Sequence, residues 1–168
     1  MGNLVVQKYG GMCLSSPEKI VATAKKIARR VQHGDQIIVI VSAMGKSTDE
    51  LIRLAYQVSP HPQRRELDMF LSTGERISMS LLTMALIDLG VKAISFTGSQ
   101  AGVFTNHSHS NAKIVDIKAH RIEEELKKGG IMKLSKLCTR STATNCTPFV
   151  TFVFLISKDN NGLGIACS

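Results

Sequence analysis

Long apolar runs are absent from this sequence. No run exceeds five residues, the length of residues 152–156, whereas a helix that crosses a bilayer needs about 20 residues. The first residues also lack the basic segment and following apolar stretch of an export signal. We therefore expect no membrane partner, no export and a cytoplasmic location.

Patterns for metal binding and disulfide frameworks are missing as well. The four cysteines form no Cys-x-x-Cys pair and have no histidine at zinc-finger spacing. Three histidines lie in a polar stretch and a charged segment without a paired cysteine or carboxylate: His107, His109 and His120. The sequence therefore predicts exposed histidines, no protein metal site and the reduced thiols of a cytoplasmic protein.

The net charge of +8 would suit a nucleic-acid partner if the basic residues were clustered. They are distributed instead: Lys25, Lys26, Arg29 and Arg30 follow one face of an expected helix. Such spacing is typical of a solvated helix surface. We expect no nucleic-acid partner, and a basic nucleic-acid binder remains the weakest of three functional hypotheses.

The two commonest nucleotide-binding motifs, the P-loop and the Gly-x-Gly-x-x-Gly fingerprint, do not occur. What does occur is a short apolar run that ends in Lys8 and continues into Gly10 and Gly11. Glycine allows backbone N–H groups to approach an anion, so this turn could bind phosphate. Taken alone, the same pattern is more often a simple chain reversal.

Apolar periodicity predicts alternating strands and helices. Ser16 is a candidate N-cap with Pro17 after it, and Gly34 is placed to end that helix. Ser47 or Thr48 is expected to cap the next helix. The expected strands cover residues 3–7, 37–41, 92–97 and 112–117, and the expected helices cover 17–33, 47–58, 64–88 (with a break at residue 74 left open) and 119–128. This order predicts an α/β fold with a mainly parallel sheet and helices on both faces.

Five segments together resemble the aspartate kinases of the amino-acid kinase superfamily. They read VVQKYGG at 5–11, VSAMGKSTDEL at 41–51, STGER at 72–76, SFTGSQAG at 95–102 and NAKIVD at 111–116. The resemblance covers residues 3–131, roughly the first half of the kinase domain. It implies an incomplete carbamate kinase-like fold, and phosphoryl transfer from ATP to the β-carboxylate of L-aspartate in lysine, threonine and methionine biosynthesis.

The resemblance also implies roles for individual residues. Lys8 would be catalytic and would bind the transferred phosphoryl group, with Gly10 and Gly11 donating backbone N–H groups and Ser42 at the nucleotide site. ATP would bring Mg²⁺ with it. The partners would be ATP and L-aspartate, and a homo-oligomer is compatible with the family.

Two positions are implied as aspartate-binding, Thr48 and Glu75. The Glu75 carboxylate suits the α-ammonium group of the substrate because it accepts charge-assisted hydrogen bonds. Without the resemblance, Glu75 is better explained as an acid in the first turn of a helix.

The sequence departs from the family in two places. Met12 and Cys13 stand where the family has hydroxyl residues, so two phosphate donors are replaced. Residues 132–168 hold four basic and one acidic side chain and read as a divergent tail, so we place a boundary after residue 131. We expect this tail to lack the family's next buried strand, its glycine-rich loop and its adenosine site. The competing hypothesis is therefore a catalytically inactive half-domain or interaction module that keeps part of the pocket.

Overall fold

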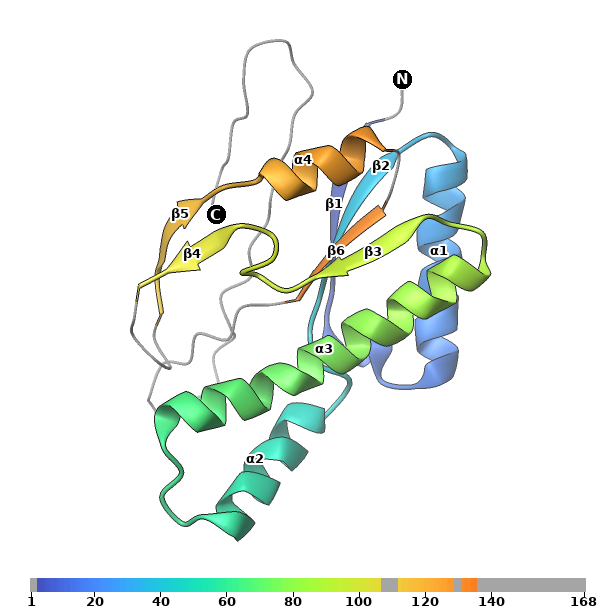
Figure 1. Ribbon diagram of the computed structural model, residues 1–168. Helices are drawn as coiled ribbons and strands as arrows, with labels where there is room; N and C mark the ends of the chain where they lie inside the picture. Colours follow the sequence, from blue (N-terminus) through green and yellow to red (C-terminus); the bar gives the residue numbers. More distant parts are fainter. Residues whose placement is uncertain (1–2, 107–111, 129–130, 136–168) are drawn as a thin grey trace.

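The computed structural model describes residues 3–106, 112–128 and 131–135. Its main sheet has four strands in the order β1-β2-β6-β3, and every neighbouring pair is parallel (Figure 1). The strands are β1 (Leu4–Tyr9), β2 (Gln36–Val41), β6 (Ile131–Ser135) and β3 (Ala93–Phe96). β2 is paired on both sides, which fits its uninterrupted β-branched sequence. The predicted α/β fold with a mainly parallel sheet is confirmed.

Helices cover both faces of this sheet (Figure 1). On one face, α1 (Pro17–Gln32) and α3 (Arg64–Asp88) share a core with Ile37 and alternate residues of β2. On the other face, α4 (His120–Lys127) packs over Ile38. Neighbouring β2 residues therefore face different cores, as the alternation of a strand requires. Two further helices follow the ends of β1 and β2: the 3-10 helix η1 (Gly11–Leu14) and α2 (Ser47–Val58).

Strand β6 corrects one expectation. We expected no family-like strand after residue 131, yet residues 131–135 form a strand that pairs with β2 on one side and β3 on the other. The sequence signal was weak because Lys133 and Ser135 interrupt the apolar pattern. The rest of the expected tail, residues 136–168, lies outside the described residues, and the boundary itself stays a prediction.

A second sheet consists of two antiparallel strands, of which the sequence predicted only one. It consists of β4 (Val103–Thr105) and β5 (Ile114–Ile117), which pair Val103 with Ile117. The strand predicted at 112–117 is confirmed as β5. β4 was missed because three residues are too few for a period to be read from sequence.

The sequence predicted the helix boundaries better than it predicted the residues that cap the helices. Ser16 caps α1 as predicted, its Oγ accepting the Lys19 N–H at 3.4 Å. α2 instead has Lys46 at its N-cap position, so neither Ser47 nor Thr48 caps it. α3 runs through Gly74 without a break. No helix among the described residues is long and apolar enough to span a membrane.

Candidate active site

Two turns meet at the carboxyl edge of the sheet. Because β1 and β2 are parallel, the residues that follow them leave the sheet on the same side. The Ser42 N–H donates to the Tyr9 carbonyl at 3.1 Å, and the Gly45 N–H donates to the Gly11 carbonyl at 3.0 Å. These two bonds fix the turn after β1 against the turn after β2.

Gly11 is required by the closeness of this contact. A Cβ atom at position 11 would lie 2.5 Å from the Ala43 carbonyl oxygen and 3.2 Å from the Gly45 carbonyl oxygen. Neither neighbour is a flexible side chain, so any other residue here would push the two turns apart. Gly10 is different, because no atom of the described residues lies within 4 Å of the place its Cβ would take. Of the two glycines, only Gly11 is therefore required by close packing at the sheet edge.

Helix α3 closes the same edge from the side. A Cβ atom on Gly74 would lie 3.1 Å from the Cβ of Ala43, two residues beyond the end of β2. One turn later, the Ser78 Oγ donates to the Ser42 carbonyl at 2.8 Å. Glu75 lies between these contacts and is only 3% exposed. This acid is therefore in the buried middle of a long helix beside the turn, and the first-turn explanation for Glu75 was wrong.

The structure places the other predicted residues as follows. Lys8 is exposed on β1 and pairs in register with Ile40. It points to the sheet face opposite that of Tyr9, whereas α3 packs on the Tyr9 face. Thr48 lies in the first turn of α2, half-buried. Gly11 and Gly74 both approach Ala43, the neighbour of Ser42. The approach of Lys8 to Glu75 remains a prediction.

Two serines at this edge, Ser47 and Ser78, were not predicted as site residues. Ser78 is fully buried and bonds to the turn after β2, as described above. The Ser47 Oγ is buried without a hydrogen-bond partner among the described residues. A serine within an apolar helical stretch is a weak signal, because its partner depends on tertiary packing.

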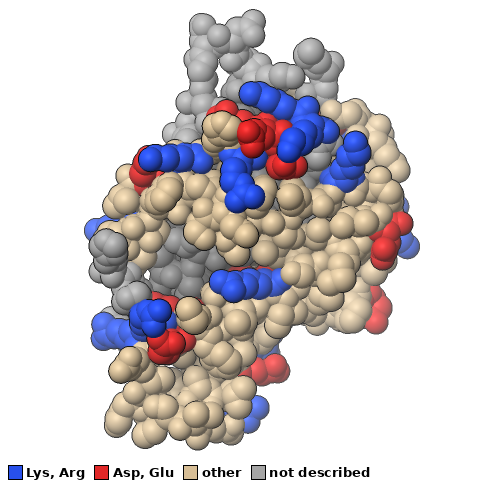
Figure 2. Space-filling view, viewed as in Figure 1, with Lys and Arg blue, Asp and Glu red and all other residues tan. Residues whose placement is uncertain are grey.

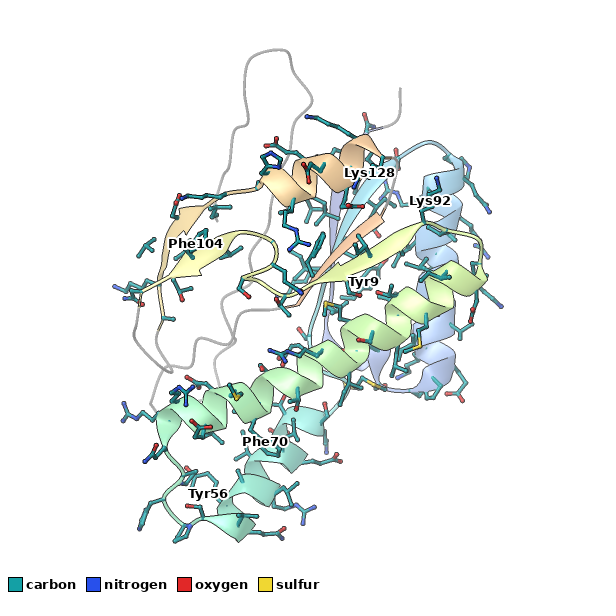
Figure 3. All side chains as sticks on the ribbon, in the orientation of Figure 1. Tyr9, Tyr56, Phe70, Lys92, Phe104 and Lys128 are labelled. Atoms are coloured by element: carbon teal, nitrogen blue, oxygen red, sulfur yellow. The ribbon has the colours of Figure 1, made fainter. Side chains whose placement is uncertain are left out.

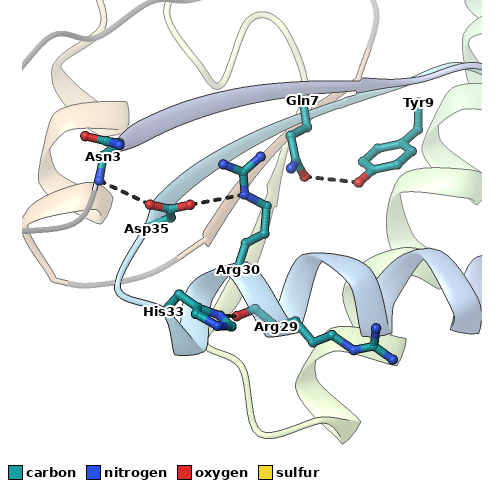
Figure 4. Close-up of polar contacts among 7 residues, drawn as sticks. All are labelled: Asn3, Gln7, Tyr9, Arg29, Arg30, His33 and Asp35. Atoms are coloured by element: carbon teal, nitrogen blue, oxygen red, sulfur yellow. Dashed lines mark hydrogen bonds and ion pairs between the residues drawn. The ribbon is translucent and has the colours of Figure 1, made fainter.

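Polar contacts also hold the start of β1 and the end of α1 together (Figure 4). The Arg30 Nε donates to Asp35 at 3.1 Å, and the other Asp35 oxygen accepts the Asn3 N–H at 3.2 Å. Nearby, the Tyr9 hydroxyl donates to the Gln7 side chain at 3.0 Å. Burial raises the pKa of Tyr9 above its ordinary value of 10.0, so this phenol stays protonated and a donor at neutral pH. The start of β1 is therefore bonded to the turn after α1, whereas the bond between Tyr9 and Gln7 lies within β1.

A charged surface and a hollow lie away from this edge. On the face in view, Lys and Arg are interspersed with Asp and Glu, most densely over α4 (Figure 2). A hollow of about 550 Å³ at the amino edge of the sheet is lined in part by Lys92 and Lys128 (Figure 3). Strand direction separates this hollow from the carboxyl edge, so it is not part of the site.

No group of three or more His, Cys, Asp or Glu side chains is gathered anywhere in the part of the chain that the structure describes. His120 is exposed, as predicted, but it has a carboxylate neighbour that the sequence analysis overlooked: its Nδ1 lies 3.4 Å from Glu124. His107 and His109 lie outside the described residues.

Comparison with known proteins identifies the family. The model of the amino acid kinase family matches residues 3–159. Aspartokinase of Geobacillus stearothermophilus is 49% identical over 129 residues, which are 77% of this chain and 32% of that protein. Aspartokinase of Corynebacterium glutamicum is 52% identical over 128 residues, which are 76% of this chain and 30% of that protein. The chain thus spans about a third of the length of these curated relatives.

Solved structures agree. Aspartate kinase from Synechocystis is 45% identical and superimposes with a TM-score of 0.67, covering 78% of this chain and 21% of that one. E. coli aspartokinase III, in complex with aspartate and ADP, has a TM-score of 0.66 at 16% identity, covering 79% of this chain and 40% of that one, and shows the fold alone. Family model, sequence and fold agree, and the chain belongs to the amino acid kinase family.

Proposed function

We propose that this chain provides part of an aspartate kinase site, which transfers a phosphoryl group from ATP to the β-carboxylate of L-aspartate. The observation that carries the proposal is the contact of three segments at one sheet edge: Gly11, the turn of residues 42–45, and Gly74 with the buried Glu75. These segments hold motifs shared with aspartokinases. The structure of E. coli aspartokinase III, which has the same fold, contains aspartate and ADP.

On the nucleotide side, the proposed reaction requires positive charge and oriented N–H donors around the transferred phosphoryl group. A β-carboxylate oxygen attacks the γ-phosphorus, the bond to the bridging oxygen breaks, and ADP and 4-phospho-L-aspartate result. The carboxylate, with a pKa near 3.9, is already ionised, so no general base is needed. Lys8 and the N–H groups of Gly10 and Gly11 would offset the charge of the transferred group, with Ser42 beside the nucleotide.

On the aspartate side, Glu75 would accept hydrogen bonds from the α-ammonium group and Thr48 would bind a substrate oxygen. Mg²⁺ would arrive with ATP and neutralise phosphate charge. The product would enter lysine, threonine and methionine biosynthesis. We also propose a cytoplasmic location, supported by the exposed free thiol of Cys13.

A second candidate is a half-domain that binds aspartate or phosphate without turning ATP over. The fact that favours it is coverage, because the chain matches only 32% of the length of the Geobacillus enzyme. Both candidates need the same pocket. Binding therefore tests the site, and turnover separates the two.

Aspartate binding can be followed by amide chemical shifts of the isotope-labelled chain. Under the proposal, L-aspartate shifts the signals of residues 42–48 and of Gly11, and Glu75→Gln abolishes these shifts. Succinate has the two carboxylates without the ammonium group, so it should bind the wild type more weakly than L-aspartate does. Its affinity for Glu75→Gln should equal its affinity for the wild type. Glu124→Gln, on α4 over the other face of the sheet, is the control for loss of a carboxylate. Shifts that are absent, or that Glu75→Gln leaves unchanged, would exclude the proposed pocket.

A further inference from the structure

Strand β1 has one open side. Among the described residues it lies at the end of the main sheet and pairs only with β2. The Asn3 carbonyl accepts the Gln36 N–H at 2.9 Å, and the Tyr9 carbonyl accepts the Ser42 N–H at 3.1 Å. Since the backbone groups of a strand alternate in direction, the odd-numbered residues of β1 turn toward β2. The other residues direct their N–H and C=O groups to the open edge: Leu4, Val6 and Lys8.

This open edge lacks most features that protect exposed edge strands. Natural edges are shielded by short length, proline, charge or a bulge. β1 has six residues, no proline and one charge, that of Lys8, and its register with β2 is continuous. Five of the six residues are also half-buried. Because partly buried N–H and C=O groups need partners, the edge is suited to a further strand.

We propose that residues 149–156 of this chain pair with the open edge of β1 and extend the main sheet by one strand. The segment reads FVTFVFLI and lies outside the described residues. All its residues except Leu155 are β-branched or aromatic, the classes that favour strands. Residues 141–157 contain no charge. Left unpaired, such a run would promote aggregation, so pairing with β1 satisfies the segment as well as the edge.

The chain between β6 and this segment is long enough to make the connection. β6 ends with Ser135 at the carboxyl edge, three strand positions from the open side of β1. Neighbouring strands are about 4.8 Å apart, so the lateral distance is about 14 Å. A parallel strand also requires a return to the amino edge, which takes a crossover of about a dozen residues. Residues 136–148 provide 13, so the segment reaches the edge in either direction.

The other open edge of the sheet, at β3, suits this segment less. β3 has four residues, whereas β1 has six and can pair with more of the segment. The start of β3 also borders the hollow lined in part by Lys92 and Lys128. An uncharged segment gains nothing from two lysines. Length and charge therefore both favour β1 as the partner.

Amide hydrogen exchange of the full-length chain tests the proposal. β2 does not bond the amides of Leu4, Val6 and Lys8, so an open edge predicts fast exchange at these three positions. With the added strand, they should exchange at least about tenfold more slowly than unbonded exposed amides. Exchange in the wild type at the rate of an open edge would overturn the proposal.

A proline in the segment should remove this protection. Val153→Pro deletes a backbone donor and should speed exchange at the three amides at least about tenfold. Ala143→Pro, in the connection, is the matched control for a new proline and should leave them slow. The amide of Val39, which is fully buried on β2, reports whether each variant stays folded. If Val39 stays slow and Val153→Pro leaves the three amides protected, a different group covers the edge and the proposal fails.

Nuclear Overhauser effects in the wild-type chain do not depend on the stability of any variant. We expect effects between Val6 and residues 149–156 of the same chain. Effects that join the segment to β3 instead would overturn the proposal. Effects seen only between differently labelled copies would overturn it as well, because a second copy would then supply the strand. The outcome is independent of the proposed activity, since both measurements are made without substrates.

Discussion

At the scale of single residues, Gly10 and Gly11 look alike in sequence but differ in the structure. Gly11→Ala should destabilise the fold, because its Cβ would meet the Ala43 carbonyl oxygen at 2.5 Å. We expect a loss of about 1–3 kcal/mol in the free energy of unfolding, the range for forced overpacking. Gly10→Ala is the control, since its φ of -72° and open surroundings accept a side chain. Urea denaturation measures both, and equal stabilities would contradict the packed turn.

Met12 and Cys13 belong to the same scale. Both are exposed beside the proposed phosphate turn. The double variant Met12→Thr, Cys13→Ser should bind ATP more tightly, because each hydrogen bond to a charged group is worth roughly 1.5–3 kcal/mol. Calorimetry checks this, with Met69→Thr on α3 as the control for an exposed methionine. An unchanged affinity would mean that this turn does not contact the nucleotide.

At the scale of elements, one hydroxyl connects α3 to the end of β2. Ser78→Ala removes the bond from the Ser78 Oγ to the Ser42 carbonyl and should cost about 1 kcal/mol of stability. It should also change the amide shifts of residues 42–45. Ser72→Ala is the matched control, because among the described residues the Ser72 Oγ bonds only to the Met69 carbonyl of its own helix. If both variants lose the same stability and the amide shifts of residues 42–45 do not change, the bond from Ser78 to Ser42 does not stabilise the fold.

Also at this scale, β6 shows where periodicity stops being informative. A central strand is held by backbone hydrogen bonds to the strands on both sides, so its sequence need not alternate between apolar and polar residues. β6 is such a strand, because it pairs with both β2 and β3. The family-like turns could be predicted because glycine and strand signals are local. The missing α2 cap and the short β4 are outcomes of packing rather than of local preference.

At the scale of the whole molecule, the isolated chain should show at most trace aspartate kinase activity. It spans about a third of its curated relatives, and lost alignment of two reactants can forfeit on the order of 7–11 kcal/mol of barrier reduction. Purified chain is assayed for ADP and for aspartyl phosphate trapped as its hydroxamate. Lys8→Ala is the control for adventitious kinase. Robust turnover that disappears in Lys8→Ala would contradict the expectation and identify the chain as sufficient for catalysis.

The sequence by itself determined the helices, the buried strand β2, the glycine turn after β1 and the motifs of the family. These depend on periodicity and backbone preference over a few residues, which act wherever the chain is placed. Tertiary structure decided which of these pieces meet. Ser78 reaches Ser42 across 36 positions, and Gly74 packs on Ala43, only because the sheet order and the path of α3 bring them to one edge. Such contacts depend on packing between distant segments, and no local pattern encodes them.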